Sequence, residues 1–223
     1  MTRQMILDLP VRQARGRDDF FVSPANALAL ATLDAPAGWP AGRMLLTGPE
    51  GAGKSHLAAI WAEAQEAPVL AARDLTDADA PRLARARAAV IEDAQQTAAA
   101  GAEEALFHLC NLMQAEGGRL LLTALAPPRD WGLRLPDLLS RMEATALVRI
   151  AAPDDALLSA VLVKLFNDRQ TKVPHSLIPW LVTRMDRSLG TARRLVAALD
   201  ARAVAEGRPL TRAMAAEVLD SFA

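Results

Sequence analysis

The chain has 223 residues, a length that fits one domain or a large domain with a small companion. Hydrophobic residues make up 52% of it, charged residues 23% and aromatic residues 4%, which is typical of a mainly helical globular protein and excludes a disordered one. The formal net charge of −1 lacks the basic excess of proteins that bind a phosphate backbone tightly, so we expect no strong direct DNA binding.

Cysteine content and hydropathy exclude further classes. The single cysteine, Cys110, can form no intramolecular disulfide, and its helical spacing from Leu106, Leu109 and Met113 predicts a buried structural thiol. No apolar run reaches membrane-spanning length, and residues 1–9 lack the basic start and long apolar stretch of a secretory signal. We therefore expect a cytoplasmic protein without a membrane segment.

Short apolar runs alternate with helical patterns between residues 44 and 150. This alternation predicts an α/β fold in which helices flank a parallel sheet. Between the runs, apolar residues recur at three- and four-residue steps and give each helix one apolar face. We expect five strands, at residues 44–47, 68–72, 88–92, 119–124 and 147–150.

After residue 150 the sequence indicates helices only. Pro153, Asp154 and Asp155 predict the start of a helix, because proline and carboxylates favour the first turn. Breaks that contain proline or glycine separate four predicted helices, near residues 153–170, 175–186, 190–206 and 211–222. We expect a core at residues 12–152, a small helical domain at residues 153–223 and a separate N-terminal segment at residues 1–11.

The segment after the first predicted strand matches the phosphate-binding pattern G-x-x-x-x-G-K-[ST]. A strand precedes it and an amphipathic helix follows, as this motif requires, which disfavours a glycine-rich turn that matches by chance. Lys54 would reach the β- and γ-phosphates and the Ser55 hydroxyl would ligate Mg²⁺, so we expect ADP or ATP with Mg²⁺ as the ligand. The matching residues are Gly48, Pro49, Glu50, Gly51, Ala52, Gly53, Lys54 and Ser55.

Two carboxylates, Glu92 and Asp93, close the third predicted strand. Nucleotide enzymes use carboxylates at such a place to hold Mg²⁺ and to orient water. Glu92 stands where aspartate is usual, and its longer side chain argues against fast hydrolysis by this chain alone. The alternative interpretation is that both residues merely close a buried strand.

Three further residues are candidates for contact with the phosphates. Thr123 ends the fourth strand, where its hydroxyl would sense the γ-phosphate or the attacking water, and Arg141 and Arg193 are candidate cations. Threonine is common at strand ends and helical arginines are commonly solvated, so these residues alone leave the roles open.

Taken together, these segments resemble the AAA+ ATPases of the replication initiator DnaA group, and in particular the DnaA-related regulatory inactivators. The likeness covers nearly the whole chain and implies an AAA+ core followed by a helical lid. Residues 19–26 look like the segment that lines the adenine pocket in that group, which implies nucleotide contacts for Phe21 and Val22. The Gly-Lys-Ser-His-Leu run at residues 53–57 is similar to the Walker A ending and adds His56 to the nucleotide site.

The resemblance also implies roles for the polar residues. Glu92 and Asp93 occupy the Walker B place, Thr123 the sensor 1 position and Arg193 the sensor 2 position. Arg141, preceded by Ser140, looks like the arginine finger, which in such families reaches into a neighbouring subunit's site. Arg141 would thus act in trans on ATP bound by a partner.

A short N-terminal motif completes the resemblance. The Gln-Met-Ile-Leu-Asp-Leu run at residues 4–9 resembles the peptide by which such proteins dock on the DNA polymerase III sliding clamp. Gln4, Leu7 and Leu9 would bind in an extended conformation, with the apolar side chains in a pocket. Met5 replaces the more usual leucine, which affects the strength of docking, and an ordinary strand or frayed tail would have the same pattern.

The function implied is a regulator of chromosomal replication initiation that binds ADP or ATP and the clamp and promotes hydrolysis of DnaA-bound ATP. The sequence ends directly after the predicted lid, so we expect no DNA-binding domain of the initiator's kind. The alternatives are a helicase-loader or mobile-element AAA+ ATPase, which would carry its own helicase- or DNA-binding extension, and a small-molecule kinase, which would want a substrate lid inside the core. The sequence leaves open which nucleotide is the active ligand, whether the chain hydrolyses it and whether a homodimer forms.

Overall fold

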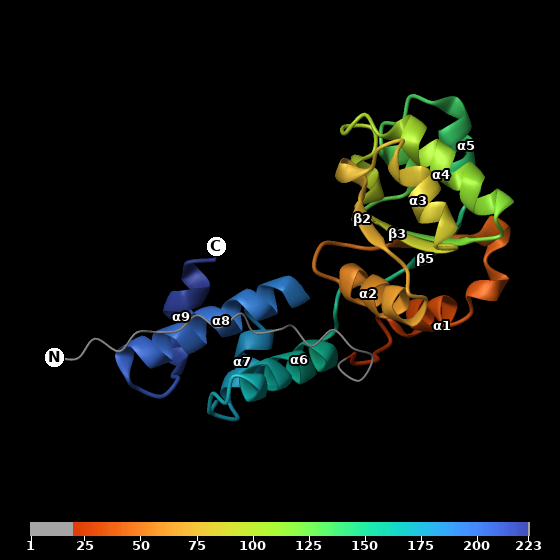
Figure 1. Ribbon diagram of the computed structural model, residues 1–223. Helices are drawn as coiled ribbons and strands as arrows, with labels where there is room; N and C mark the ends of the chain where they lie inside the picture. Colours follow the sequence, from red (N-terminus) through yellow and green to blue (C-terminus); the bar gives the residue numbers. More distant parts are fainter. Residues whose placement is uncertain (1–19, 223) are drawn as a thin grey trace.

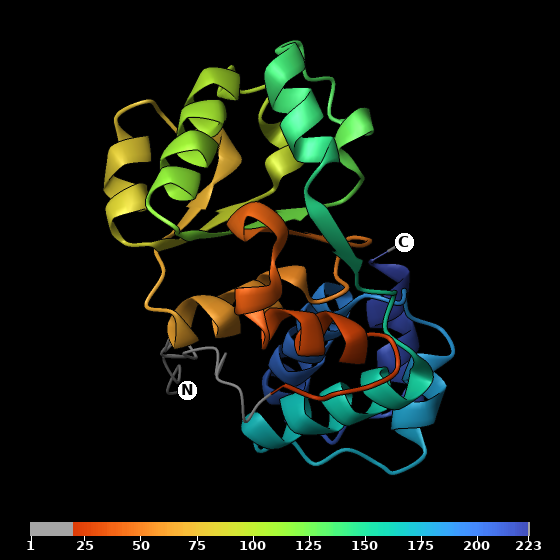
Figure 2. The same cartoon turned by 90° about the vertical axis from the view of Figure 1, so that its right-hand side faces the viewer.

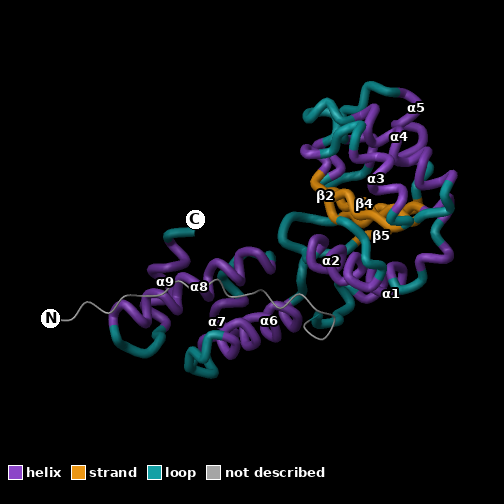
Figure 3. The backbone as a smooth tube through the Cα atoms, viewed as in Figure 1, coloured by secondary structure: helices purple, strands orange, loops and turns teal. Residues whose placement is uncertain are grey.

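A computed structural model describes residues 20–222. Its centre is a sheet, drawn in orange in Figure 3. The sheet has five strands in the order β2-β3-β4-β1-β5. Every strand pairing is parallel, so the carboxyl ends of all strands lie at one edge. This confirms the predicted fold class, and each strand lies within one residue of its predicted bounds. The strands are β1 (Arg43–Thr47), β2 (Val69–Ala71), β3 (Ala88–Glu92), β4 (Arg119–Ala124) and β5 (Ala146–Arg149).

Helices cover both faces of the sheet (Figures 1 and 2). Successive side chains of a strand point to opposite faces, so Leu45 packs into one apolar layer while Met44 and Leu46 pack into the other. The central strands are buried on both sides and therefore read as continuous apolar runs. The Leu45 face carries α3 (Asp79–Arg85), α4 (Glu103–Ala115) and α5 (Pro136–Glu143), and the opposite face carries α1 (Ala27–Leu33) and α2 (Lys54–Ala64).

Cys110 lies in the middle of α4 and is fully buried, as its helical spacing predicted. The helices α1, α3 and α5, in contrast, were not predicted as separate elements. They have seven, seven and eight residues, which is less than the window over which helical periodicity becomes visible. Each nevertheless buries a leucine against the sheet: Leu33, Leu83 and Leu138.

The C-terminal part is a helical lid with its own apolar core, seen as a second lobe in Figure 1. Asp154, Ser188 and Thr211 cap three of its helices, because each side chain accepts a hydrogen bond from a backbone N–H group three residues later. The first lid helix begins two residues later than predicted, since Asp154 is its cap and Pro153 precedes it. The helices are α6 (Asp155–Asp168), α7 (Leu177–Val182), α8 (Leu189–Glu206) and α9 (Arg212–Asp220).

The lid helix α7 is shorter than the predicted 175–186, because the chain bends before it and after Val182. Within residues 20–222, no helix combines the length and the apolar character that crossing a bilayer requires.

Candidate functional site

The candidate site lies at the carboxyl edge of the sheet. The loop of residues 48–53 follows β1, which pairs with β4, and β4 pairs in turn with β3. Ile91 is opposite Leu122, so the next residues along these two strands, Glu92 and Thr123, are neighbours. The register therefore brings the predicted phosphate loop, the carboxylates and the threonine together.

Three glycines allow the loop its path. Gly51 and Gly53 have φ angles of +70° and +106°, in the left-handed region that favours glycine. A Cβ atom on Gly48 would lie 2.4 Å from the carbonyl oxygen of Ile150, so the loop backbone approaches the segment after β5 closely. The loop leads directly into α2, whose first N–H groups lack partners within the helix and attract anions.

Lys54, the first residue of α2, is a buried cation inside this loop. Its Nζ atom donates hydrogen bonds to the carbonyl oxygens of Gly48 (2.8 Å) and Pro49 (2.9 Å). Burial lowers the pKa of the Lys54 ammonium, while Asp93, Glu50 and Glu92 act in the opposite direction. The ammonium is thus held beside the phosphate loop and shares its electrostatic environment with the carboxylates.

The first turn of α2 also meets the residues that precede α1. Ser55 is exposed, and the ring of His56 contacts the ring of Phe20 edge-on with a centroid distance of 5.4 Å. Phe21 and Val22 follow with exposed fractions of 39% and 59%. An exposed apolar surface beside the phosphate loop is suited to a nucleotide base.

Glu92 and Asp93 behave differently although they are adjacent. The Oε1 atom of Glu92 is buried and has no hydrogen-bond partner within residues 20–222. Asp93 has a φ of +54°, and its backbone N–H donates a 3.2 Å hydrogen bond to the hydroxyl of Thr123, which is 1% exposed. The Thr123 hydroxyl therefore stabilises a backbone conformation that is unusual for a residue other than glycine.

Gln95 is a site residue that the sequence reasoning missed. Its Nε2 atom donates to a carboxylate oxygen of Asp93 (3.3 Å), and its Oε1 atom accepts from the backbone N–H of Leu125 (3.2 Å). Gln95 thus connects the ends of β3 and β4 and occupies one oxygen of the Asp93 carboxylate. The sequence shows Gln95 two residues after the carboxylate pair. Its contact with residue 125, however, depends on the pairing of β3 with β4, which the sequence does not show.

The residues present fit a nucleotide with Mg²⁺. A buried carboxylate oxygen without a partner is costly unless a cation or water satisfies it, and Glu92 presents such an oxygen at the site. Ser55 at the start of α2 and Glu92 at the end of β3 are oxygen donors of the kind that Mg²⁺ prefers. Across residues 20–222, no three His, Cys, Asp or Glu side chains gather into a protein-only metal site.

The lid touches the phosphate loop directly. The backbone N–H of Leu189, the first residue of α8, donates a 2.8 Å hydrogen bond to the carbonyl oxygen of Gly51. A Cβ atom on Gly51 would lie 2.0 Å from Oγ of Ser188, so the two segments are packed without space between them. Arg193, the predicted sensor 2 residue, is half-buried in the following turn of α8.

Arg141 lies away from this site. Its Nη1 atom donates to Oε1 of Gln114 on α4 (3.4 Å), an atom that also accepts from Arg43 at the amino end of β1 (3.2 Å). Five residue steps of about 3.3 Å separate Arg43 from Gly48, so the Arg43 end of the sheet is about 16 Å from the phosphate loop. The structure therefore does not bring Arg141 together with Lys54, Glu92 and Thr123 of its own chain.

The predicted clamp-binding residues Gln4, Leu7 and Leu9 lie outside the described residues.

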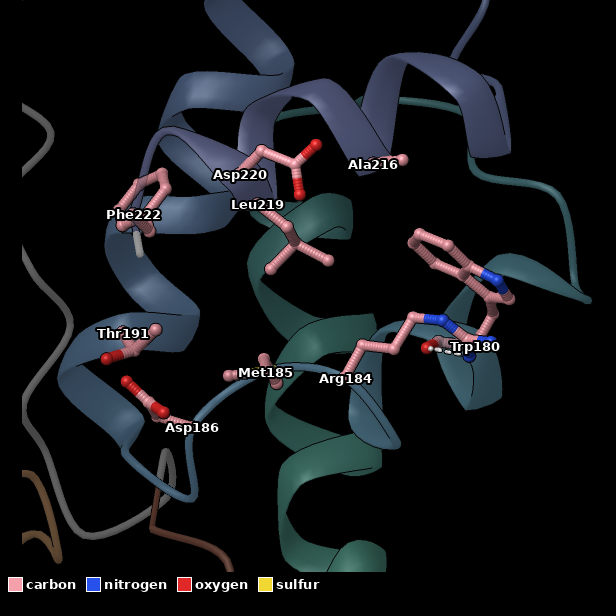
Figure 4. A pocket seen from close by; sticks show the side chains of 9 residues that line it. All are labelled: Trp180, Arg184, Met185, Asp186, Thr191, Ala216, Leu219, Asp220 and Phe222. Carbon is pink, nitrogen blue, oxygen red and sulfur yellow. Dashed lines mark hydrogen bonds between the residues drawn. The ribbon is translucent and has the colours of Figure 1, made fainter.

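A separate cavity of about 410 Å³ lies in the lid, between α7, α9 and the start of α8 (Figure 4). The Arg184 guanidinium lies over the ring of Trp180 there, 4.5 Å from its centroid, and donates to the Trp180 carbonyl oxygen. Leu219 contributes an apolar wall to this cavity.

The fold is similar to that of AAA domains of known structure. No protein-family model matches the sequence. The AAA domain of FIGL-1 in complex with ADP is similar in structure, with a TM-score of 0.68 and 17% identity over 91% of this chain and 82% of that domain.

Within this class the fold is DnaA-like. Domain III of the replication initiation protein DnaA from Thermotoga maritima is similar with a TM-score of 0.79 and 18% identity, over 96% of this chain and 99% of that domain. AMPPCP-bound DnaA from Aquifex aeolicus is similar with a TM-score of 0.66 and 16% identity, over 83% of this chain and 64% of that protein.

Proposed function

We propose that the protein binds ADP or ATP with Mg²⁺ at the carboxyl edge of the sheet. The support is local: a loop with three glycines, the N-terminus of α2, the buried Lys54 and the unpartnered oxygen of Glu92 meet there. Ser55 and Glu92 would hold the metal, and Phe21, Val22 and His56 would contact the base. The ligands in the similar structures, ADP and AMPPCP, agree with this class of ligand.

Intrinsic hydrolysis by this site is expected to be slow. Glu92 takes the place that a shorter aspartate usually has, and one oxygen of Asp93 is engaged by Gln95. A carboxylate that is held by a side-chain amide is less available to orient water. The nucleotide would then serve mainly to stabilise the arrangement of core and lid, with Arg193 as an additional phosphate contact from the lid.

We further propose that the protein is a regulator of replication initiation like Hda, the DnaA-related regulatory inactivator, and that it promotes hydrolysis of ATP bound to DnaA. The carrying observation is the position of Arg141, which donates to Gln114, the acceptor that also binds Arg43, at the opposite edge from its own phosphate loop. A guanidinium at that edge is free of its own nucleotide and is available to a neighbouring molecule. Arginine fingers supplied in this way accelerate phosphoryl transfer by about 10³-fold or more.

Residues 1–11 would bring the protein to the DNA polymerase III sliding clamp, with Gln4, Leu7 and Leu9 as the contacts. The clamp would then hold the protein close to DnaA, which raises their effective concentration without any new contact.

Hydrolysis of DnaA-bound ATP in the presence of DNA-loaded clamp tests this proposal. The intact protein should stimulate hydrolysis, and Arg141→Ala should abolish the stimulation. Gln4→Ala should abolish the part of the stimulation that depends on the clamp. Arg129, an exposed arginine paired with Asp130, provides the matched control, and Arg129→Ala should stimulate as the intact protein does. Absence of stimulation by intact protein that binds nucleotide would contradict the proposal and favour the helicase-loader class.

A further inference from the structure

The side chain of Gln114 joins two arginines that come from different parts of the fold. Its Oε1 atom accepts from Nη1 of Arg43, at the start of β1, and from Nη1 of Arg141, in the last turn of α5. The Arg141 guanidinium also lies over the ring of Phe107, 5.1 Å from its centroid, and Phe107 is on the same face of α4 as Gln114, two turns earlier. Arg141 is therefore held against α4 by one amide oxygen and one aromatic ring.

In the part of the chain that the structure describes, no carboxylate neutralises these arginines. Within residues 20–222, neither Arg43 nor Arg141 forms an ion pair, although Arg43 is only 6% exposed and its Nε atom has no acceptor. Burial lowers the pKa of the Arg43 guanidinium; the nearby Arg141 charge adds to the lowering and Cys110 opposes it. The cluster thus keeps two positive charges close together around a neutral acceptor.

The choice of a neutral acceptor matters for what Arg141 can do. A glutamate at position 114 would form charge-assisted hydrogen bonds with both arginines and would cancel part of the charge that Arg141 carries. The amide orients the guanidinium and leaves its charge available. Its hydrogen bond to Arg141 is 3.4 Å long, against a usual length of about 2.9–3.0 Å, so an anionic oxygen can replace it at little cost.

We propose that Gln114 is a positioning residue for Arg141, which holds the guanidinium in place for a phosphate of a partner's nucleotide without neutralising it. This inference rests on the proposed action of Arg141 in trans. Arg43 shares the acceptor, and its buried positive charge lies near that of Arg141, so the two guanidinium groups repel each other across the Gln114 oxygen. Gln114 itself is exposed and lies on the same surface.

The test measures kcat and KM for stimulated hydrolysis, with DnaA-bound ATP as the varied substrate and clamp on DNA in excess. Gln114→Ala should lower kcat about tenfold with KM unchanged, because a catalytic group that is no longer preorganised loses rate and not affinity. Gln114→Glu should lower kcat further, while its melting temperature stays at or above that of the intact protein. Asn111→Ala, on the same helix one turn earlier, should leave both parameters unchanged.

A double mutant separates positioning from a general structural role. In an Arg141→Lys background, which lacks the guanidinium but keeps a cation and part of the stimulation, Gln114→Ala should lower kcat much less than it does in the intact protein, because the group that it positions is already absent. An additive loss in the double mutant, or a Gln114→Glu variant as active as the intact protein, would overturn the inference. If the intact protein itself fails to stimulate hydrolysis, the proposed function fails instead, so the two failures are distinguishable.

Discussion

The backbone N–H of Leu189 donates a hydrogen bond of 2.8 Å to the carbonyl oxygen of Gly51, so the lid rests directly on the phosphate loop. The same contact brings Oγ of Ser188 to the place where a Cβ atom of residue 51 would lie. Because the loop that would surround the phosphates also supports the lid, ligand binding and lid position are expected to be coupled.

Gly51→Ala should separate the lid from the loop. The methyl group would meet Ser188 Oγ at 2.0 Å and would also strain the backbone at a φ of +70°. Gly101→Ala is the matched control, since its φ of +69° imposes the same strain with no atom within 4 Å. We expect Gly101→Ala to cost about 1–2 kcal/mol of unfolding free energy and to leave ADP affinity unchanged. Gly51→Ala should lower the unfolding free energy by more than this and should weaken ADP binding, measured by calorimetry, at least about tenfold. Equal losses of stability and affinity in the two variants would contradict the coupling.

Glu92→Gln should reveal whether the buried carboxylate holds Mg²⁺. The substitution keeps the shape of the side chain and removes its charge, so the part of the nucleotide affinity that depends on Mg²⁺ should fall by about tenfold or more. Binding measured in EDTA should not fall. Glu63→Gln, at an exposed position of α2, is the control and should retain the Mg²⁺ dependence. Unchanged Mg²⁺ dependence in Glu92→Gln would remove this residue from the metal site.

Thr123→Val should destabilise the end of β3. The substitution removes the hydroxyl that accepts from the Asp93 N–H at 3.2 Å and leaves that donor without its partner. We expect a loss of about 1–3 kcal/mol in the free energy of unfolding by urea, together with slower intrinsic ATP hydrolysis. Thr183→Val removes an exposed hydroxyl that donates to the Trp180 carbonyl oxygen and should change stability by less than about 0.5 kcal/mol. Equal losses in the two variants would argue against a special role for Thr123.

Alkaline pH should destabilise the protein through Cys110. Burial raises the pKa of this thiol from 9.0 to about 11, against the opposing influence of Arg43 and Arg141. Between these two values the unfolded chain has lost the proton and the folded chain keeps it, so unfolding is favoured as the pH rises. The stabilisation that the protonated Cys110 thiol contributes is fully present below pH 9. It is lost as the pH rises through 11, at up to about 1.4 kcal/mol of unfolding free energy per pH unit.

Cys110→Ala tests this dependence. In urea unfolding at pH 7, 9 and 10, the free energy of unfolding should fall less with rising pH for the variant than for the intact chain. The cavity left by the missing sulfur atom lowers stability by the same amount at each pH and does not affect this comparison. Parallel curves for the two proteins would show that other groups cause the alkaline destabilisation.

Features that depend on neighbouring residues in the chain could be predicted well. The strands β1, β3 and β4 are buried on both faces, so each appears as an apolar run of its own length. The phosphate loop is contained in eight consecutive residues, and its required flanks, a strand and a helix, adjoin it. Glu92 and Thr123 could be placed at the same edge because parallel strands bring their carboxyl ends together.

Short elements and long-range contacts could not be predicted in the same way. The helices α1 and α3 have seven residues each, too few for a clear periodicity. The partner of Gln95, the backbone of Leu125, depends on the pairing of β3 with β4. The joint contact of Arg43 and Arg141 with Gln114 brings together three segments whose spacing along the chain carries no signal.

The sequence by itself thus determined the α/β class, the phosphate loop and the polar residues at the ends of its strands, because local burial patterns and backbone requirements are recorded residue by residue. Only the tertiary structure decided that Leu189 of the lid contacts Gly51, and that Arg141 lies at the opposite edge of the sheet from its own phosphate loop. Such relationships arise from strand order and from the packing of layers, which join residues that are distant in the chain and chemically ordinary on their own.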